Sequence, residues 1–120
     1  MEIRKKSRQD SAILELTGEF DLNEVELFEG VFRELVENPE YKRIILDFKL
    51  LTFLGSSGIS SLIGMSRLLG GLKEGHIYIL NANDYIRDLV RMTGIESIVR
   101  LIDAWEYKRL TGHDIHPGNN

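Results

Sequence analysis

The sequence predicts a single α/β domain built on one mixed, mainly parallel sheet, and three observations support this prediction. The chain has 120 residues, 42% of them hydrophobic, which suits one well-filled core and leaves no room for a second domain of ordinary size. It opens with two β-type segments separated by a polar turn, a pattern typical of an antiparallel hairpin. Beyond the hairpin, helical and strand-like segments alternate, which indicates parallel strands joined by crossover helices.

The predicted strands are short segments rich in β-branched and aliphatic residues. Residues 3–9 and 12–16 form the hairpin, and the charged first segment has the character of an edge strand. Residues 43–48 are a nearly continuous apolar run, as in a strand that helices cover. Residues 76–80 and 98–101 supply two further candidates. We therefore expect a sheet of four or five strands.

Four segments have the character of helices. Apolar residues recur at helical spacing over residues 22–37, where Asp21 has the position of an N-cap and Glu24 completes a capping box. On the last helix, Trp105 and Tyr107 are expected to pack against the sheet. A second helix is expected at residues 59–69, and a third begins after an N-cap at Asp84 and stops at Thr93-Gly94. The last helix covers residues 104–110. Residues 1–111 then form the domain, and residues 112–120 a flexible tail.

Composition excludes several classes of protein. The formal net charge is −4 and the isoelectric point about 5.4, which argues against a surface that binds nucleic acid. The lack of cysteine excludes disulfides, thiolate metal sites and a cysteine nucleophile. No apolar run approaches the ~20 residues of a membrane helix, and the polar N-terminus lacks the apolar stretch of a signal peptide. We expect a soluble cytoplasmic protein that binds no nucleic acid and does not insert into a membrane.

The sequence also lacks the common motifs of enzymes. It contains no G-x-S-x-G, no G-x-x-x-x-G-K-[ST] and no G-x-G-x-x-G. His76 begins a predicted strand, while His113 and His116 lie in the predicted tail, so neither a triad base nor a zinc-binding H-E-x-x-H pair is present. With Asp114, the two tail histidines offer at most a stray metal site. We therefore expect no catalytic residue, no cofactor and no defined metal site.

The segment Gly55-Ser56-Ser57-Gly58 is the unusual feature of the chain, because two hydroxyls and two glycines separate an apolar run from a helix. One interpretation is structural: Ser56 or Ser57 is the N-cap of that helix. The other is a phosphorylation site. The positive end of the helix stabilises a phosphate, and the added charge expels a partner from an apolar surface. Apolar residues that surround the serines are Leu50, Leu51, Phe53, Leu54 and Ile59.

Three blocks of the sequence resemble STAS-domain proteins of the anti-sigma factor antagonist type. Residues 44–48 and 51–59 are similar to the family's strand followed by a D-S-S-G-L-type turn and a helix. Residues 18–21 resemble its early G-x-[LF]-D element, and residues 81–95 resemble its late helix that runs into [ST]-G-[LI]. The blocks occur in the family's order and span residues 3–110.

This resemblance implies a fold and a function. The family fold is a mixed sheet with its helices, about four here, packed on one side. The unphosphorylated family member binds an anti-sigma factor, often also a serine kinase, and thereby releases a sigma factor. The kinase phosphorylates the first serine of the motif, which by position is Ser56, with Ser57 as second choice, and a serine phosphatase reverses this. The implied partner-binding residues are Asp21, Phe53, Leu54, Gly55, Ser56, Ser57, Gly58 and Ile59.

One departure from the family pattern leaves other functions open. The family usually has aspartate before the phosphorylated serine, and this chain has Gly55. The alternative is therefore a STAS accessory subunit of a transporter or of a stress-sensing complex, which is not phosphorylated. A third class is a small hydrolase that uses Ser56 or Ser57, but no base is placed to activate either hydroxyl.

Overall fold

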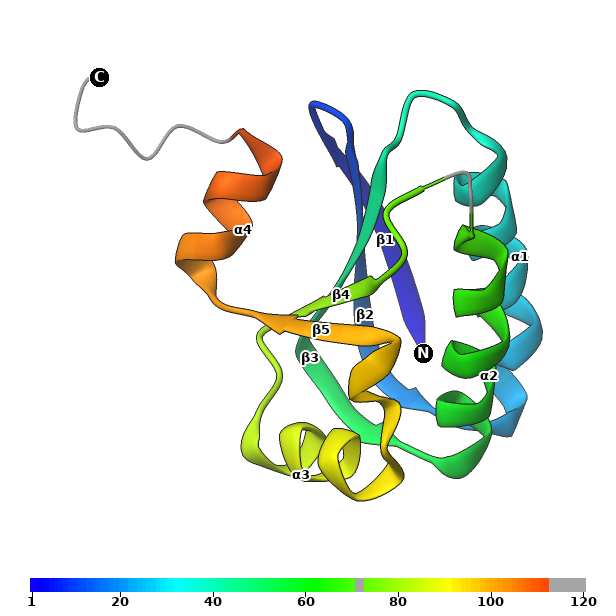
Figure 1. The fold of residues 1–120 in the computed structure, drawn as a ribbon. Coiled ribbons are helices and arrows are strands. Elements are labelled where there is room, and N and C mark those ends of the chain that lie inside the picture. The colour runs from blue at the N-terminus through cyan, green and yellow to red at the C-terminus, as the bar shows by residue number, and fades with distance from the viewer. Residues whose placement is uncertain (71–72, 113–120) are drawn as a thin grey trace.

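One mixed sheet organises the protein (Figure 1). The computed structural model describes residues 1–70 and 73–112, so the predicted tail, apart from Gly112, lies outside the described residues. The strands are β1 (Glu2–Arg8), β2 (Ser11–Phe20), β3 (Arg43–Leu54), β4 (Ile77–Leu80) and β5 (Val99–Ile102), and they lie side by side in that order. Only β1 and β2 are antiparallel. The predicted α/β class and mainly parallel sheet are confirmed.

The connections carry three α-helices, α1 (Val25–Glu37), α2 (Ser56–Ser66) and α3 (Asp84–Thr93), and α4 (Ala104–Thr111) follows β5. The same described segments include short 3₁₀ turns, η1 (Leu22–Glu24), η2 (Arg67–Leu69) and η3 (Ile95–Ser97). The predicted capping box is confirmed, because the Asp21 carboxylate accepts from the Asn23 N–H at 3.2 Å and the Glu24 carboxylate accepts from the Asp21 N–H at 3.3 Å. The predicted cap at Asp84 is wrong. Asn83 caps α3, and its side chain accepts from the Ile86 N–H. None of the described helices is long and apolar enough to cross a membrane.

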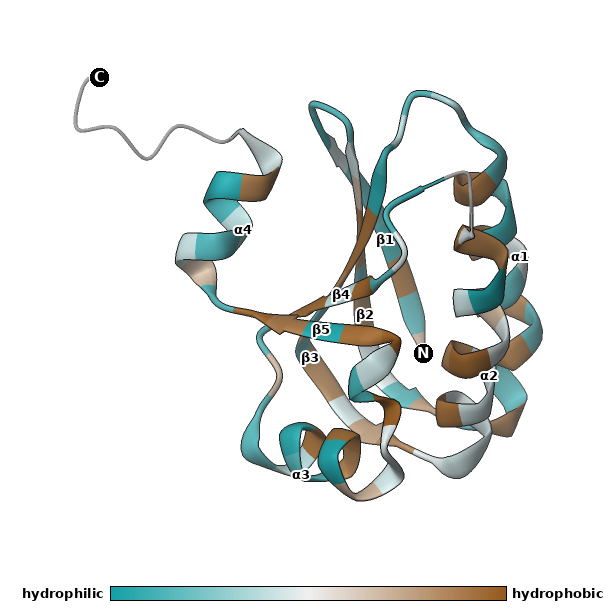
Figure 2. Ribbon diagram, viewed as in Figure 1, coloured by the Kyte–Doolittle hydropathy of each residue, from teal (hydrophilic) through white to brown (hydrophobic). Residues whose placement is uncertain are grey.

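The main core lies between the sheet and α1, α2 and α3. Successive residues of a strand point to opposite faces, so Leu14 and Leu46 enter this core. It includes a row of three mutually tilted rings, Phe20 at the end of β2 and Phe28 and Phe32 on α1, with successive centroids 4.8 and 5.6 Å apart. Figure 2 shows brown along much of β3, β4 and β5 and brown patches on α1 and α2.

The opposite face of the sheet carries a second apolar cluster, which corrects one expectation. Four helices were expected on one side, but α4 lies across the sheet from α1 and α2 (Figure 1). The strands β2, β3, β4 and β5 are apolar on this face too, and α4 covers it with Tyr107 and Leu110. Trp105 does not pack as expected, since it is 60% exposed. The buried strand residues of this cluster are Ile13, Ile45, Tyr78, Leu80 and Ile102.

The long parallel strands β2 and β3 bring two distant segments together. Residues 43–48 and 51–54 are not separate but form one strand of 12 residues, whose register with β2 is irregular between Glu15 and Thr17 and again after Gly18. Despite these irregularities the strands end as neighbours, because Phe20 pairs with Leu54. The chains that leave them, toward η1 and α2, therefore lie side by side at one edge of the sheet.

Two backbone contacts hold the start of α2 against the end of β2. The Gly55 N–H donates to the Phe20 carbonyl oxygen at 2.9 Å. A Cβ atom on Gly58 would lie 2.9 Å from that same oxygen and 2.8 Å from Cδ1 of Leu54. Real Cβ atoms do not approach so closely, so only glycine allows the first turn of α2 to lie there.

Replacing Gly58 by alanine should destabilise the protein, because the new methyl group must displace a backbone oxygen. We expect Gly58→Ala to lower the free energy of unfolding by about 1–3 kcal/mol, as measured by urea denaturation. Gly64→Ala on the same helix is the matched control. A Cβ there meets nothing within 4 Å, so the substitution should be neutral or stabilise by up to about 1 kcal/mol. Equal effects of the two substitutions would contradict the packing argument.

The Arg43 guanidinium ties α4 to the other end of the sheet. It donates to the Asp10 carboxylate at 2.8 Å, to the Glu74 carboxylate at 2.7 Å and to the Leu110 carbonyl oxygen at 2.7 Å. Glu74 also accepts from the Tyr78 hydroxyl. Burial alone would raise the pKa of the Glu74 carboxyl, but these hydrogen bonds from Arg43 and Tyr78 outweigh it and hold the pKa below its usual value.

This network predicts an acid-dependent term in stability. Because the pKa of Glu74 is lower in the folded protein than in the unfolded chain, its contribution is complete above the unfolded pKa of about 4.5. It is lost as the pH falls through the folded pKa. We expect Glu74→Gln to destabilise by about 1 kcal/mol at neutral pH, a modest value for a partly exposed pair. The difference should shrink below pH 4.5 in denaturation curves recorded from pH 7 to 3. A difference that grows with acid would contradict the assignment.

Candidate functional site

The two serines lie in the first turn of α2, at its exposed end. Ser56 is the first residue of the helix and is exposed, and Ser57 is half-buried. The first helical hydrogen bond runs from the Ile59 N–H to the Gly55 carbonyl oxygen at 3.0 Å. The N–H groups of the three preceding residues therefore have no partner within the helix. They give the end of the helix its partial positive charge, close to the serine hydroxyls.

The prediction that Ser56 or Ser57 caps this helix is wrong. The N-cap is Gly55, in an extended conformation with φ −85° and ψ 176°, and it has no side chain to accept a hydrogen bond. The helix starts at Ser56, earlier than its apolar pattern suggested, and the Gly55 N–H just before it donates to the Phe20 carbonyl oxygen. Both serine hydroxyls are thereby left without a capping role.

Two shallow hollows, each of about 340 Å³, flank the serines. Both are lined by Ser56, Ser57 and Leu22. The first hollow lies between α2 and the start of α1, and the second lies toward the ends of β2 and β3. Additional lining residues are Val25, Glu29, Ser60 and Ser61 in the first hollow, and Asp21, Asn23, Phe53 and Gly55 in the second.

Apolar side chains are exposed around these hollows. Leu22 is 72% exposed, Phe53 41% and Tyr85 41%. The Tyr85 hydroxyl donates to the Leu54 carbonyl oxygen at 3.3 Å, so α3 also contributes to this end of the molecule. Leu54 and Gly58, which the resemblance placed among the partner-binding residues, are buried and lie beneath the surface.

The charged groups that line the hollows are carboxylates. Asp21 lies in one hollow and Glu29 in the other, and neither hollow has a lysine or arginine among its described lining residues. A phosphate on Ser56 would therefore meet backbone N–H groups but no cationic side chain among the described residues that line these hollows. Its negative charge would add to that already present and would be presented to the outside.

The other two serines of α2 differ in role. Ser61 is buried, and its hydroxyl donates to Glu29 at 2.8 Å, which joins α2 to α1. Ser60 is exposed and lines the first hollow. Ser61 is thus structural.

The ring of Phe53 limits the space for a side chain at Gly55, the residue before Ser56. A Cβ atom on Gly55 would lie 3.0 Å from Cε2 of Phe53 and 3.5 Å from Cβ of Asp21. An aspartate at position 55 would therefore press on the Phe53 ring and bring a second carboxylate beside Asp21. The departure from the family's pattern fits the exposed ring that this chain carries at position 53.

Sequence reasoning missed Leu22, Tyr85 and Glu29. Leu22 lies in a 3₁₀ turn before the periodic part of α1, and Tyr85 lies beside the apolar stripe of α3. The isolated position of a large apolar residue next to an N-cap was the one available signal. Glu29 has no local signal, since its contact with Ser61 spans 32 positions.

Comparison with known proteins identifies the family. The family model of the STAS domain matches residues 2–107. An anti-sigma F factor antagonist from Paenibacillus polymyxa is 24% identical over 103 residues, covering 86% of this chain and 87% of that protein.

Solved structures have the same fold. An anti-sigma factor antagonist from Mycobacterium paratuberculosis superposes with a TM-score of 0.78 at 17% identity, covering 94% of each chain. The unphosphorylated form of the anti-sigma factor antagonist SpoIIAA gives 0.70 at 22% identity, covering 91% of this chain and 94% of that one. The family model matches most of the length of the chain, and the sheet order and the helix that follows β3 agree with the fold of the solved structures. The chain therefore belongs to the STAS domain family.

Proposed function

We propose that this protein is a cytoplasmic anti-sigma factor antagonist that a phosphate on Ser56 switches off. Unphosphorylated, it binds an anti-sigma factor that is also a serine kinase, and a sigma factor is released. Phosphorylation of Ser56 ends the binding, and a serine phosphatase restores it. The similarity to named antagonists supports the class of partner. The observation that supports the switch is the exposed Ser56 hydroxyl at the start of α2, among exposed apolar side chains.

The physical basis of the switch is the change in charge on an apolar surface. Covering Leu22 and Phe53 with an apolar partner is favourable, and the neutral serine hydroxyls cost little free energy of desolvation. A phosphate adds about −1.5 to −2 charges at pH 7. Burying it against an apolar partner requires removal of its water without a lysine or arginine to compensate, and that desolvation opposes binding.

In this proposal the protein is a phosphoryl acceptor and not an enzyme. The Ser56 oxygen attacks the γ-phosphorus of ATP bound to the kinase, its proton passes to a base of the kinase, and ADP leaves. His76, the histidine within the described residues, precedes β4, whereas Ser56 follows β3. Since these strands are parallel, the two residues lie at opposite ends of the sheet, so His76 does not serve Ser56 as a base.

A non-phosphorylated accessory subunit remains the second candidate, and Gly55 favours it. The space that the family's aspartate would need is limited by Phe53, so a kinase that reads that carboxylate finds no such group here. Purification of the protein with its bound partner separates the two functions. A histidine-kinase-like ATPase supports the antagonist, and a transporter ATPase supports the accessory subunit.

Incubation with the co-purified kinase and MgATP should add a single phosphate to the protein, and Ser56→Ala should abolish this addition. The measurement is intact mass, followed by peptide mapping of the modified residue. Ser57→Ala is the matched control, since it removes the neighbouring hydroxyl and should leave at least about half of the phosphorylation rate if Ser56 alone is the acceptor. A phosphate that persists in Ser56→Ala would reject this site, and no phosphate on the wild-type chain would favour the accessory subunit.

The exposed apolar residues beside Ser56 should contribute directly to binding. Leu22→Glu and Phe53→Glu should each weaken the partner's affinity at least about tenfold, because each places a charge in the proposed interface. Met92→Glu, on the exposed side of α3, is the control and should bind as the wild type does. Affinities come from calorimetric titration, and circular dichroism checks that each variant is folded. If all three variants bind equally well, the interface lies elsewhere.

A further inference from the structure

The outer flank of α1 carries a shallow apolar groove of about 670 Å³. Its lining residues recur at spacings of three, four and seven, which places them on one side of the helix. Leu27, at the centre of the groove, is 50% exposed. Val31 lies deeper and packs partly on the core. The lining residues are Asn23, Glu26, Leu27, Gly30, Val31 and Glu34, and we call this the α1 groove.

Packing within the described fold does not explain why position 30 of the groove is a glycine. It lies in the middle of α1, where glycine destabilises a helix relative to alanine. Its backbone is exposed, and a Cβ atom there would meet nothing within 4 Å. A bare stretch of helix backbone lets the backbone of another molecule approach closely. Gly30 thus leaves room along α1 that no described part of this chain fills.

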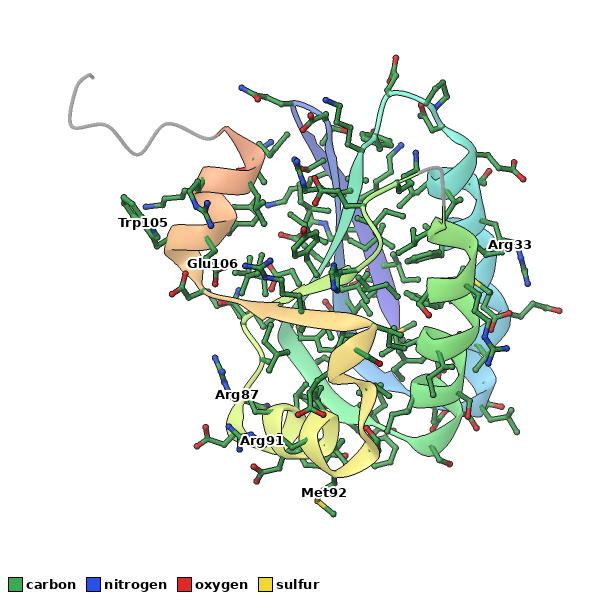
Figure 3. The ribbon with its side chains drawn as sticks, in the orientation of Figure 1. Arg33, Arg87, Arg91, Met92, Trp105 and Glu106 are labelled. Carbon is green, nitrogen blue, oxygen red and sulfur yellow. The ribbon has the colours of Figure 1, made fainter. Side chains whose placement is uncertain are left out.

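The rim of the α1 groove is acidic. Glu26 and Glu34 are exposed, and neither forms an ion pair within the described residues. Arg33, which points outward in Figure 3, pairs with Glu29 at 3.4 Å. Glu29 also accepts from Ser61 of α2. Arg33 follows Gly30 by three positions and therefore lies beside the groove, but its guanidinium is paired with Glu29 and does not line the groove. The groove therefore presents carboxylates on both sides of Leu27 and Gly30 with no cation among its lining residues.

We propose that the α1 groove binds a basic amphipathic helix of a partner protein. The apolar side of that helix covers Leu27 and approaches Gly30, and its lysines or arginines lie beside Glu26 and Glu34. A second copy of α1 does not fit, because it would bring these glutamates against each other. The inference is independent of the phosphorylation switch, since Ser56 does not line the groove.

The probe is a synthetic leucine–lysine peptide with its leucines at helical spacing, and the control is a peptide of the same composition in scrambled order. We expect the helical peptide to shift the amide NMR signals of residues 26–34 and to bind at least about tenfold more tightly than the scrambled one. Shifts confined to any other surface, or equal binding of both peptides, would overturn the proposal. No kinase is involved, so failure here leaves the switch at Ser56 untouched.

Two double variants of equal net charge distinguish binding at the α1 groove from nonspecific electrostatic attraction of the basic peptide. Glu26→Lys with Glu34→Lys reverses the rim, and we expect at least a tenfold loss of affinity for the helical peptide. Glu40→Lys with Glu96→Lys changes two other exposed glutamates, and we expect a loss of less than about threefold, as for distant surface charges. Equal losses would mean that net charge alone attracts the peptide, which overturns the proposal.

Gly30→Gln tests the close approach, because its Cβ would meet nothing within 4 Å and the rest of its side chain would occupy the groove. We expect it to weaken peptide binding about tenfold while raising the melting temperature, since a glycine leaves the helix interior. Unchanged affinity would contradict the model of a close helix–helix contact. Sedimentation of the protein alone provides a further check. A dimer that Gly30→Gln dissociates would make the occupant a second copy and overturn the proposal.

Discussion

The contact of α2 with the end of β2 is the constraint on which the position of the candidate site depends. The Phe20 carbonyl oxygen accepts from the Gly55 N–H and also faces the bare Cα of Gly58. Because nothing larger than a hydrogen fits there, the first turn of α2 is fixed beside the segment that follows β2. Asp21 and Ser56, 35 positions apart in the sequence, thus reach the same edge of the sheet. The serine hydroxyl owes its exposure to this arrangement of backbone, not to hydrogen bonds of its own.

The sheet was predictable from sequence because local pattern carries the relevant information. Alternation of helical and strand-like segments indicates parallel pairing whatever the detailed register, and Asp21 with Glu24 marked a helix start that the structure confirms. The face that α4 covers was not predictable. Its placement depends on Ile13 and Ile45, which meet only after the sheet has formed and which lie on the face away from α1. Nothing around Trp105 distinguishes a ring that packs from one that stays exposed.

The candidate site was predictable in part for the same reason. The pair of serines before an apolar helix gave a local signal, and Ser56 does begin α2. Leu22 gave only a weak signal, its position next to an N-cap, and Tyr85 gave none, since an apolar residue outside the periodic stripe of a helix is as often incidental as functional. The α1 groove also escaped notice, because its character rests on Gly30 having open space around it, a property of the folded surface. Hydrophobic periodicity in the sequence predicts which side chains are buried, whereas a binding surface consists largely of exposed residues outside that periodicity.

In the proposed switch, the charge at Ser56 decides whether a partner binds. The direct test compares the affinity of the co-purified anti-sigma factor for the unmodified protein and for the same protein with phosphoserine introduced at position 56 by semisynthesis. Calorimetry supplies both values. We expect the phosphate to weaken binding at least about a hundredfold, in line with an uncompensated charge in an apolar interface. Equal affinities would contradict the account, because they would mean that the exposed end of α2 is not where the partner binds.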